Sequence, residues 1–364
     1  MKDQLVFHRS AFIIPSFPLM RLSDFDYELP DELIAQHPLD ERDRARMLIL
    51  NRAGQTWHDS WFAGLPSHVR AGDVVVVNNT RVFPARLLGQ REPTGGRIEL
   101  LLVRELEPLV WETLARPARR LPGGTHLKFG TGILRAEIIE ALEEGRRIVR
   151  FECDGPFAEV LDQLGQTPLP PYIKRPAGTL AEDRARYQTV YARQRGAIAA
   201  PTAGLHFTPR VIDQLKERGA QFVEITLHVG YGTFEPVRVE DLSQHTVAPE
   251  YYEIGEEAAE TINTARSREG RIIAIGTTTT RALESSLSRA GHVRAGARLA
   301  RLTITPGYEF RAVDSLLTNF HLPRSSLLVL VGAFAGRDFT LAAYRHAVRA
   351  RYRFYSYGDC MLII

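Results

Sequence analysis

The segment 200–209, APTAGLHFTP, places an imidazole among small residues that let a ligand approach the backbone closely. His206 and Phe207 stand directly before Thr208, a typical N-cap, and the N–H groups of a helix N-terminus attract negative charge. The segment could therefore bind a ligand with partial negative charge. A tight loop in which His206 satisfies a backbone carbonyl explains the same residues equally well.

A second histidine, His228, ends an expected strand over 222–229 and is followed by Gly-Tyr-Gly at 230–232. Open α/β sheets bind their ligands at such strand ends. Glu-Pro at 235–236 stands where a dinucleotide-binding fold needs its third glycine and a helix, so no Rossmann cofactor site is expected. A histidine at the edge of the core, next to a turn, is the simpler interpretation of His228.

Four threonines at 277–280 follow another expected strand and precede Arg281 and Glu284. Hydroxyls and unpaired N–H groups at a strand-to-helix junction can hold a carboxylate, a ribose or a phosphate. Thr277 or Thr278 fits a plain N-cap as well.

A third histidine, His321, shares one segment with an acid, Asp314, and an amide, Asn319. Such groups transfer protons or recognise the edge of a base. Buried polar groups bonded to the backbone explain them almost as well.

Near the C-terminus, cations alternate with aromatic side chains, a mixture that neutralises phosphates and stacks bases. The residues concerned are Arg345, Arg349, Arg351, Arg353 and Tyr355. A solvated helix face followed by a core strand accounts for them equally. For a second basic group, Arg116, Arg119 and Arg120, solvated charges in a turn are the simpler explanation.

Two kinds of periodicity indicate the elements that must position these residues. Helical and strand patterns alternate on both sides of the segment 82–154, whereas that segment has short strands with turn signals about every ten residues. We expect an α/β (mixed) main domain, 20–81 plus 155–364, with an inserted small antiparallel β-barrel domain at 82–154. Residues 1–19 are expected to be a disordered or misassigned extension. The expected main-domain strands are 47–50, 74–77, 222–229, 272–275 and 327–331, with helices after Thr208, over 258–265, through Leu283 and over 339–350.

The composition excludes several classes of protein. The chain has 364 residues, 44% hydrophobic and 24% charged, with a net charge of +3, which permits a nucleic-acid partner without requiring one. Its two cysteines match no metal spacing and favour a reducing, cytoplasmic setting. The longest apolar run, 327–335, is far shorter than the roughly 20 residues of a membrane helix. Phosphate-loop, zinc-protease and α/β-hydrolase motifs are absent from the sequence.

Several of the segments described above belong to strings that resemble the S-adenosylmethionine:tRNA ribosyltransferase-isomerase family of queuosine biosynthesis. The resemblance runs from Met20 to the end of the chain. The strings are MRLSDFDYELP, NNTRVFPARL, LPPYIKR, RYQTVYA, APTAGLHFTP, LHVGYGTF, TNFHLPRSSLLVLVGAFAG and YRFYSYGDCMLI.

The resemblance implies a β-barrel inserted in an α/β body and an unusual use of S-adenosylmethionine, whose ribosyl part moves. The acceptor is 7-aminomethyl-7-deazaguanine at the wobble position of a tRNA with a GUN anticodon. The products are epoxyqueuosine-tRNA, adenine and methionine. S-adenosylmethionine is consumed as a co-substrate, no metal or other cofactor is implied, and a monomer without membrane contact is expected.

The implied reaction needs a base for the ribose C5′ hydrogens, which the sulfonium acidifies, and an acid for the departing adenine. Our hypothesis assigns these roles among His206, His228 and His321, with Asp314 or Glu284 orienting one of them. Arg281 would pair with the methionyl carboxylate. The expected substrate-binding residues are Thr202, Phe207, Gly230, Thr277, Thr278, Arg281, Asn319, Tyr187, Gln188 and Thr189, and the C-terminal cations with Tyr355 would bind tRNA.

Two positions depart from the family's usual strings. Ala248 replaces a histidine and Asn79 replaces an aspartate, which puts any role of these positions in doubt. A non-catalytic RNA-binding protein is one alternative function, although it would not need histidines and glycines gathered at strand ends. A hydrolase with an adventitious metal is another, but neither His206 nor His228 has a second ligand at metal spacing.

Overall fold

The computed structural model of the chain describes residues 20–175, 180–230, 232 and 237–364. The strands of the body are β1 (Arg46–Asn51), β2 (Thr56–Trp61), β3 (Val74–Asn78), β12 (Gln221–Leu227), β13 (Glu250–Ile254), β14 (Ile272–Ile275), β15 (Gly296–Ala300), β16 (Ser315–Asn319) and β17 (Cys360–Ile363). Within the described residues they form one sheet in the order β15-β13-β12-β3-β14-β16-β17-β1-β2. β12, β3, β14 and β16 are parallel to one another, as are β17 and β1. The carboxyl ends of four neighbouring strands therefore meet at one edge.

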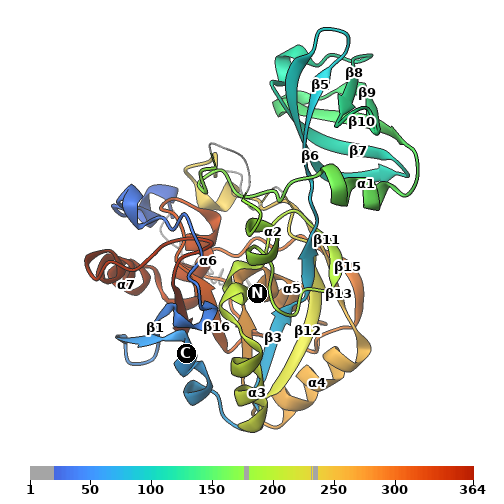
Figure 1. Cartoon of the computed structure of the whole chain (residues 1–364). Helices are drawn as coiled ribbons and strands as arrows, with labels where there is room; N and C mark the ends of the chain where they lie inside the picture. The colour runs from blue at the N-terminus through green and yellow to red at the C-terminus, as the bar shows by residue number, and fades with distance from the viewer. Residues whose placement is uncertain (1–19, 176–179, 231, 233–236) are drawn as a thin grey trace, which may run out of the picture.

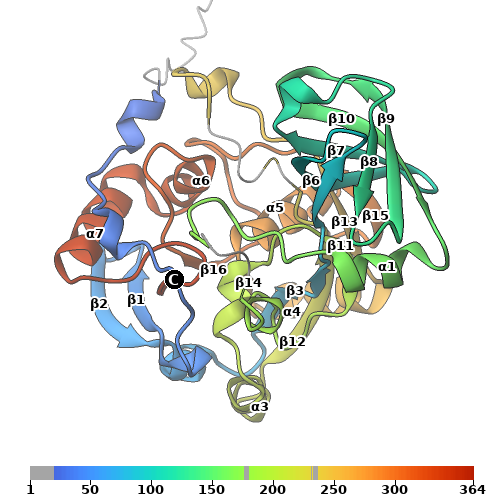
Figure 2. The ribbon, with the colours of Figure 1, turned by 45° about the horizontal axis from the view of Figure 1, so that its top comes forward.

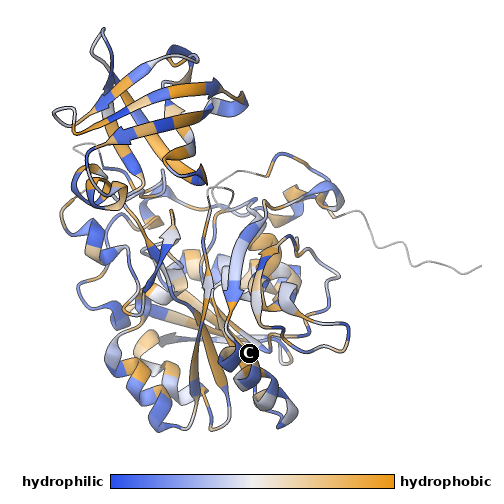
Figure 3. Cartoon of the chain, turned by 90° about the vertical axis from the view of Figure 1, so that its right-hand side faces the viewer, coloured by the Kyte–Doolittle hydropathy of each residue, from blue (hydrophilic) through white to orange (hydrophobic). Residues whose placement is uncertain are grey.

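Helices cover both faces of this sheet, which explains why β3 and β14 are buried along their whole length. α3 (Pro209–Glu217) and the 3-10 segment η4 (Phe62–His68) pack on one face, and α4 (Glu256–Ser267), α5 (Thr277–Ser286), α6 (Ser326–Ala335) and α7 (Arg337–Arg349) on the other. Figure 3 shows the hydrophobic residues concentrated on the central strands. The two short helices are α1 (Phe157–Leu164) and α2 (Asp183–Arg186).

The expected strand over 327–331 is wrong, because these residues lie in helix α6. Ser325 is its N-cap and accepts a hydrogen bond from the Leu328 N–H at 3.3 Å. α6 is apolar on nearly every side, so its sequence lacks the 3.6-residue period that distinguishes a helix from a buried strand. Among the described helices, none is long and apolar enough on its own to cross a membrane; α6 and α7 meet that test together only as a pair bent by 115°.

The predicted barrel is present and closed. Its strands are β5 (Arg86–Arg91), β6 (Gly96–Glu107), β7 (Val110–Arg116), β8 (His126–Phe129), β9 (Leu134–Ala141) and β10 (Arg146–Cys153), all paired antiparallel in the order β10-β7-β6-β5-β8-β9. Side chains of α1 join its core. The mixed α/β body with a small antiparallel barrel confirms the expected fold class, while the boundaries at 82 and 154 stay a prediction.

The barrel lies to one side of the body, with α1 at its base (Figures 1 and 2). A short parallel pair, β4 (Thr80–Val82) and β11 (Gln194–Ala197), connects the end of β3 to the segment that follows α2. Beyond β11 the chain runs through Ala199 and Ala200 into the 3-10 segment η7 (Thr202–His206). The point where the chain enters the barrel and the segment APTAGLHFTP therefore both lie beside the carboxyl edge of the sheet.

Candidate active site

A cavity of about 60 Å³ opens at the carboxyl edge of the parallel strands, where β14 passes through Gly276 into α5 and where β16 ends at Asn319. This is the place where open α/β sheets bind ligands. We call it the active-site cavity. The predicted site residues that line it are Thr202, Tyr187, Thr277, Thr278, Asn319, His321 and Tyr355.

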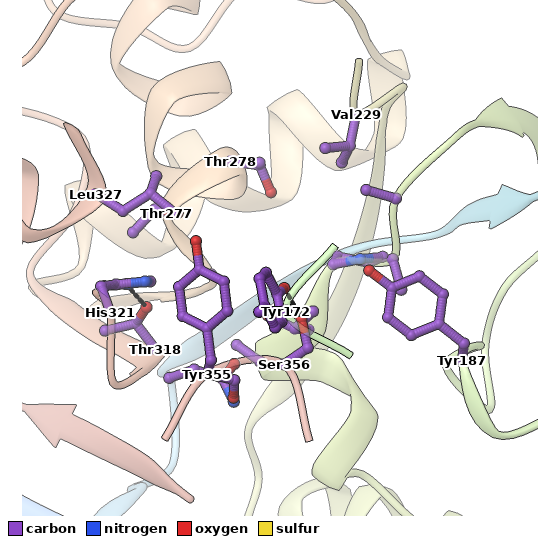
Figure 4. Close-up of a pocket in the computed structure, with 17 residues that line it drawn as sticks. Tyr172, Tyr187, Val229, Thr277, Thr278, Thr318, His321, Leu327, Tyr355 and Ser356 are labelled. Atoms are coloured by element: carbon purple, nitrogen blue, oxygen red, sulfur yellow. Dashed lines mark hydrogen bonds between the residues drawn. The ribbon is translucent and has the colours of Figure 1, made fainter. Parts of the chain in front are cut away.

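Three tyrosines surround this cavity (Figure 4). The rings of Tyr172 and Tyr355 meet edge to face with their centroids 3.9 Å apart, and Tyr172 Oη lies 2.5 Å from Ser356 Oγ. Tyr355 adopts a left-handed backbone conformation with φ of 73°, which an L residue keeps only where its surroundings enforce it. Aromatic faces of this kind suit a flat heterocycle.

His321 is the one histidine of the predicted three that lines the active-site cavity. It is buried, and its Nε2 lies 2.9 Å from Thr318 Oγ1. Its backbone N–H donates to Tyr344 Oη at 3.2 Å, which fixes the ring's attachment point. Burial lowers the pKa of His321 to about 3, so the imidazole is neutral near pH 7 and able to accept a proton.

His206 lies on the far side of Asn319, in a smaller cavity that it shares with Arg42 and Arg186. Asn319 Nδ2 donates to the carbonyls of Tyr355 at 3.1 Å and Asp359 at 3.4 Å, and it lies 3.4 Å from His206 Nε2. Burial, followed by the charges of Arg353 and Arg42, lowers the pKa of His206 to about 4.

Two carbonyl acceptors fix the orientation of the Asn319 amide, because only its NH₂ group can donate to them. The opposite atom, Oδ1, is buried without a hydrogen-bond partner among the described residues. Asn319 thus leaves one free acceptor in a residue that lines the active-site cavity, suited to an N–H group of a substrate.

His228 does not line the active-site cavity, although its neighbour Val229 does. Its ring stacks on Tyr251 at 5.6 Å, Nδ1 lies 2.8 Å from Thr80 Oγ1, and a Cβ at Gly196 would meet it at 2.6 Å. Burial lowers the pKa of His228. These are the contacts expected of a histidine at the edge of the core next to a turn.

The two predicted carboxylates lie away from the histidines. Glu284 accepts hydrogen bonds from the N–H groups of residues 311–313 and from Tyr308 Oη. Asp314 accepts from the Ile272 N–H at 2.8 Å and precedes β16, five residues and about 16 Å along the strand from Asn319. Both carboxylates fix the path of the backbone in this structure.

Arg281 is buried, and its guanidinium makes four hydrogen bonds with the described residues. It pairs with Glu250 and donates to the carbonyls of Leu302, Ala248 and Ala300 at 3.1–3.3 Å. A substrate carboxylate would have to displace these partners. Arg281 does not line the active-site cavity, but it lines a smaller neighbouring cavity together with Thr277 and Thr278. Its expected pairing with a methionyl carboxylate stays a prediction.

Four further predicted residues have structural contacts outside the active-site cavity. Phe207 packs in the core edge to face with Phe62 at 5.1 Å, and the Gly230 N–H donates to Glu250 at 3.3 Å. Gln188 bonds both the N–H and the carbonyl of Val82, and Thr189 is buried beside Gly204. Gly204 itself lies against Tyr191, so its lack of a side chain serves packing at that point.

The predicted tRNA-binding residues separate into two groups. Arg345, Arg349 and Arg351 are exposed on α7 and just after it. Arg353 is half-buried and donates to the His37 carbonyl, while Tyr355 belongs to the active-site cavity. The segment is therefore exposed along α7 and partly buried from Tyr352 onward, and its binding of tRNA stays a prediction.

The two departures from the family strings have local explanations. Asn79 Nδ2 donates to Glu224 and its Oδ1 accepts from Thr226, an arrangement that an ionised aspartate cannot make. The Ala248 carbonyl accepts from Arg281, and a Cβ at Gly232 would meet the Ala248 side chain at 2.6 Å. Neither residue lines the active-site cavity.

The chain is similar to known proteins over nearly its whole length. The family described as queuosine biosynthesis protein matches residues 22–363. Proteins named S-adenosylmethionine:tRNA ribosyltransferase-isomerase are similar over 95% of this chain and 100% of their own length: that of Moorella thermoacetica is 52% identical over 347 residues, and that of Pelotomaculum thermopropionicum 51% over 345. A crystal structure of an S-adenosylmethionine tRNA ribosyltransferase from Thermotoga maritima is 36% identical, with a TM-score of 0.53, and covers 94% of this chain and 100% of that chain. The resemblance in the sequence is confirmed, and the chain belongs to the queuosine biosynthesis protein family.

Proposed function

We propose that this chain is an S-adenosylmethionine:tRNA ribosyltransferase-isomerase. It transfers and isomerises the ribosyl part of S-adenosylmethionine onto 7-aminomethyl-7-deazaguanine at the wobble position of a GUN-anticodon tRNA. The products are epoxyqueuosine-tRNA, adenine and methionine. We further propose a cytoplasmic monomer that consumes S-adenosylmethionine and needs no resident cofactor.

The observation that carries this proposal is the neutral His321 in a cavity lined by three tyrosines. The sulfonium of S-adenosylmethionine acidifies the C5′ hydrogens, and His321 accepts one of them as general base. The imidazole becomes a cation while the sulfonium becomes an ylide without net charge, so the net charge of the buried site does not change. Because the proton transfer creates no net charge in the buried site, an imidazole with a low pKa can act as the base there.

The start of α5 supplies a place for the methionyl carboxylate. Its N-cap, Gly276, has no side chain to bond the N–H groups of the first turn, and Thr277 and Thr278 line the active-site cavity. Free N–H groups at a helix N-terminus bind carboxylates. We therefore assign the methionyl carboxylate to this helix N-terminus and not to Arg281.

The tyrosines and Asn319 position the heterocycles. Tyr172 and Tyr355 offer faces for the adenine or for the deazaguanine, and Asn319 Oδ1 accepts a hydrogen bond from an N–H edge. The aminomethyl nitrogen of the acceptor then bonds to a ribosyl carbon and loses a proton. The bond from C1′ to adenine and the bond from C5′ to the sulfonium sulfur break, and the departing adenine takes up the proton that His321 removed. A protein that only bound RNA would not need a buried, neutral histidine in this cavity.

The test incubates the purified chain with S-adenosylmethionine and a tRNA that carries 7-aminomethyl-7-deazaguanine. Nucleoside mass spectrometry should find epoxyqueuosine, with adenine released in equal amount. Deuterium at C5′ should slow turnover and be lost in part to solvent. A tRNA with guanine at the wobble position is the control. Absence of both adenine and epoxyqueuosine would refute the proposal.

A further inference from the structure

A second and larger cavity, of about 290 Å³, lies between the barrel and the body. We call it the interdomain cavity. The barrel contributes residues of β5, β6 and β7, and the body contributes the segment 168–175 and Ile198. The function proposed above makes no use of this cavity.

The interdomain cavity shares its walls with the active-site cavity. Along the segment 168–175, Tyr172 lines the active-site cavity and Ile173 lines the interdomain cavity. The same alternation occurs where Ala199 faces the former and Ile198 the latter. The same two stretches of chain therefore contribute residues to both cavities.

The walls of the interdomain cavity combine apolar surface with positive charge. Leu101, Leu114 and the prolines of 168–171 supply the apolar part. Among its charged residues, Arg86 pairs with Glu99 at 2.8 Å, and Arg175 pairs with Asp183 at 2.9 Å.

Two cations remain in this cavity after those pairs are counted. Arg116, from the barrel, and Lys174, from the body, are exposed, and neither side chain makes a hydrogen bond or ion pair with the described part of the chain. The cavity thus offers two uncompensated positive charges, one from each domain, beside apolar walls. A nucleotide has the matching chemistry, with a flat apolar base and a phosphate on each side.

We propose that the interdomain cavity binds one anticodon-loop nucleotide that neighbours the wobble nucleotide, with Arg116 and Lys174 on its flanking phosphates. This proposal rests on the proposed function, because it requires the wobble nucleotide to enter the active-site cavity. The tRNA then bridges the barrel and the body and fixes one against the other.

The test uses the full chain and an anticodon stem-loop that carries 7-aminomethyl-7-deazaguanine. Each single-strand phosphate contact contributes about 0.7 to the slope of log K against log salt. The variant with Arg116→Gln and Lys174→Gln should therefore bind with a slope smaller by about 1.4. Its kcat at saturating tRNA and its KM for S-adenosylmethionine should match those of the wild type.

The matched control carries Arg135→Gln and Arg150→Gln, two exposed barrel arginines that do not line the cavity, and it changes the net charge equally. In a series of stem-loops, one methylphosphonate replaces one anticodon-loop phosphate at a time. Wild-type binding should weaken at two neighbouring linkages. At these two linkages the methylphosphonate should have no further effect on binding by the Arg116 and Lys174 variant. Equal slopes for this variant and the control would overturn the proposal. Tight binding of a free nucleoside monophosphate with no effect of the variant on the stem-loop would also overturn it.

Two outcomes separate this proposal from the proposed function. If the wild type turns over but the variant keeps the full salt slope, only the interdomain site fails. If the salt slopes of the wild type and the variant differ as predicted but the wild type releases no adenine, the proposed activity fails and the nucleotide site stands.

Discussion

The amide of Asn319 lies between His206 and the active-site cavity, with its Nδ2 3.4 Å from His206 Nε2. Through this amide His206 is connected to a residue that lines the active-site cavity. His228 is also outside the cavity, which leaves His321 as the histidine that faces it.

The first prediction concerns these three histidines. General-base catalysis contributes about 10²–10⁴ in rate, so His321→Gln should lower kcat by that factor. His228→Gln should leave kcat close to that of the wild type, and His206→Gln should have an intermediate effect. The measurement is single-turnover adenine release at saturating substrates. A His321→Gln variant with wild-type kcat would refute the assignment of His321.

The second prediction concerns the dependence of stability on pH. The pKa values of His206 and His321 are about 4 and about 3, below the ordinary value of 6.5. Between pH 6.5 and these lower values, the unfolded chain therefore binds more protons than the folded chain does. The free energy of unfolding should therefore fall as pH falls from 6.5 towards 4, by up to about 1.4 kcal/mol per pH unit for each histidine.

Urea denaturation at several pH values tests this slope. His321→Gln and His206→Gln should each make the slope shallower, whereas Gln at the exposed His126 should not change it. An unchanged slope in both buried-site variants would contradict the prediction.

The third prediction concerns the buried pair of Arg281 and Glu250. Removing Arg281 takes its cation away from the buried Glu250 carboxylate, and breaking a buried ion pair in this way costs up to about 3–5 kcal/mol. Arg281→Met should lower the unfolding midpoint, and adding Glu250→Gln should recover part of the loss. The KM for S-adenosylmethionine of the folded fraction should stay at the wild-type value. A large rise in this KM with unchanged stability would instead support substrate binding by Arg281.

The fourth prediction concerns Gly204, where a Cβ would lie 2.1 Å from Tyr191 Oη. Overpacking of this kind costs about 1–3 kcal/mol, so Gly204→Ala should be destabilised by that amount in denaturant titrations. Gly96→Ala is the control, because its nearest contact would be an ordinary 3.8 Å to Thr94. Equal stability of the two variants would show that Tyr191 moves away freely.

Local signals account for the parts of the fold that were predicted well. Thr208 caps α3 through the Val211 N–H, Pro209 occupies its first turn, and Gly219 follows with φ of 81°, all readable within a dozen residues. α6 carries no such periodic signal because it is buried on nearly every side, and its interpretation as a strand failed for that reason.

The site was predicted only in part, because side-chain direction depends on distant contacts. The strand-end rule selected the region of His228, yet the adjacent Val229 is the residue that lines the active-site cavity. Tyr172 was missed as a site residue because its position depends on Ser356, 184 residues later in the chain. The string LPPYIKR was the available signal, since Tyr172 lies within it.

The position of β17 in the sheet has a consequence for biosynthesis. β17 lies between β16 and β1 and is synthesised after every other described strand of the sheet, whereas β5 to β10 form the barrel from one continuous segment. On the ribosome the barrel can complete its hydrogen bonds while the body still waits for its C-terminal strand. A chain that ends before residue 360 would have two unpaired strand edges in the middle of the sheet. Such edges pair with other chains, so this truncation should cause aggregation and not merely reduced activity.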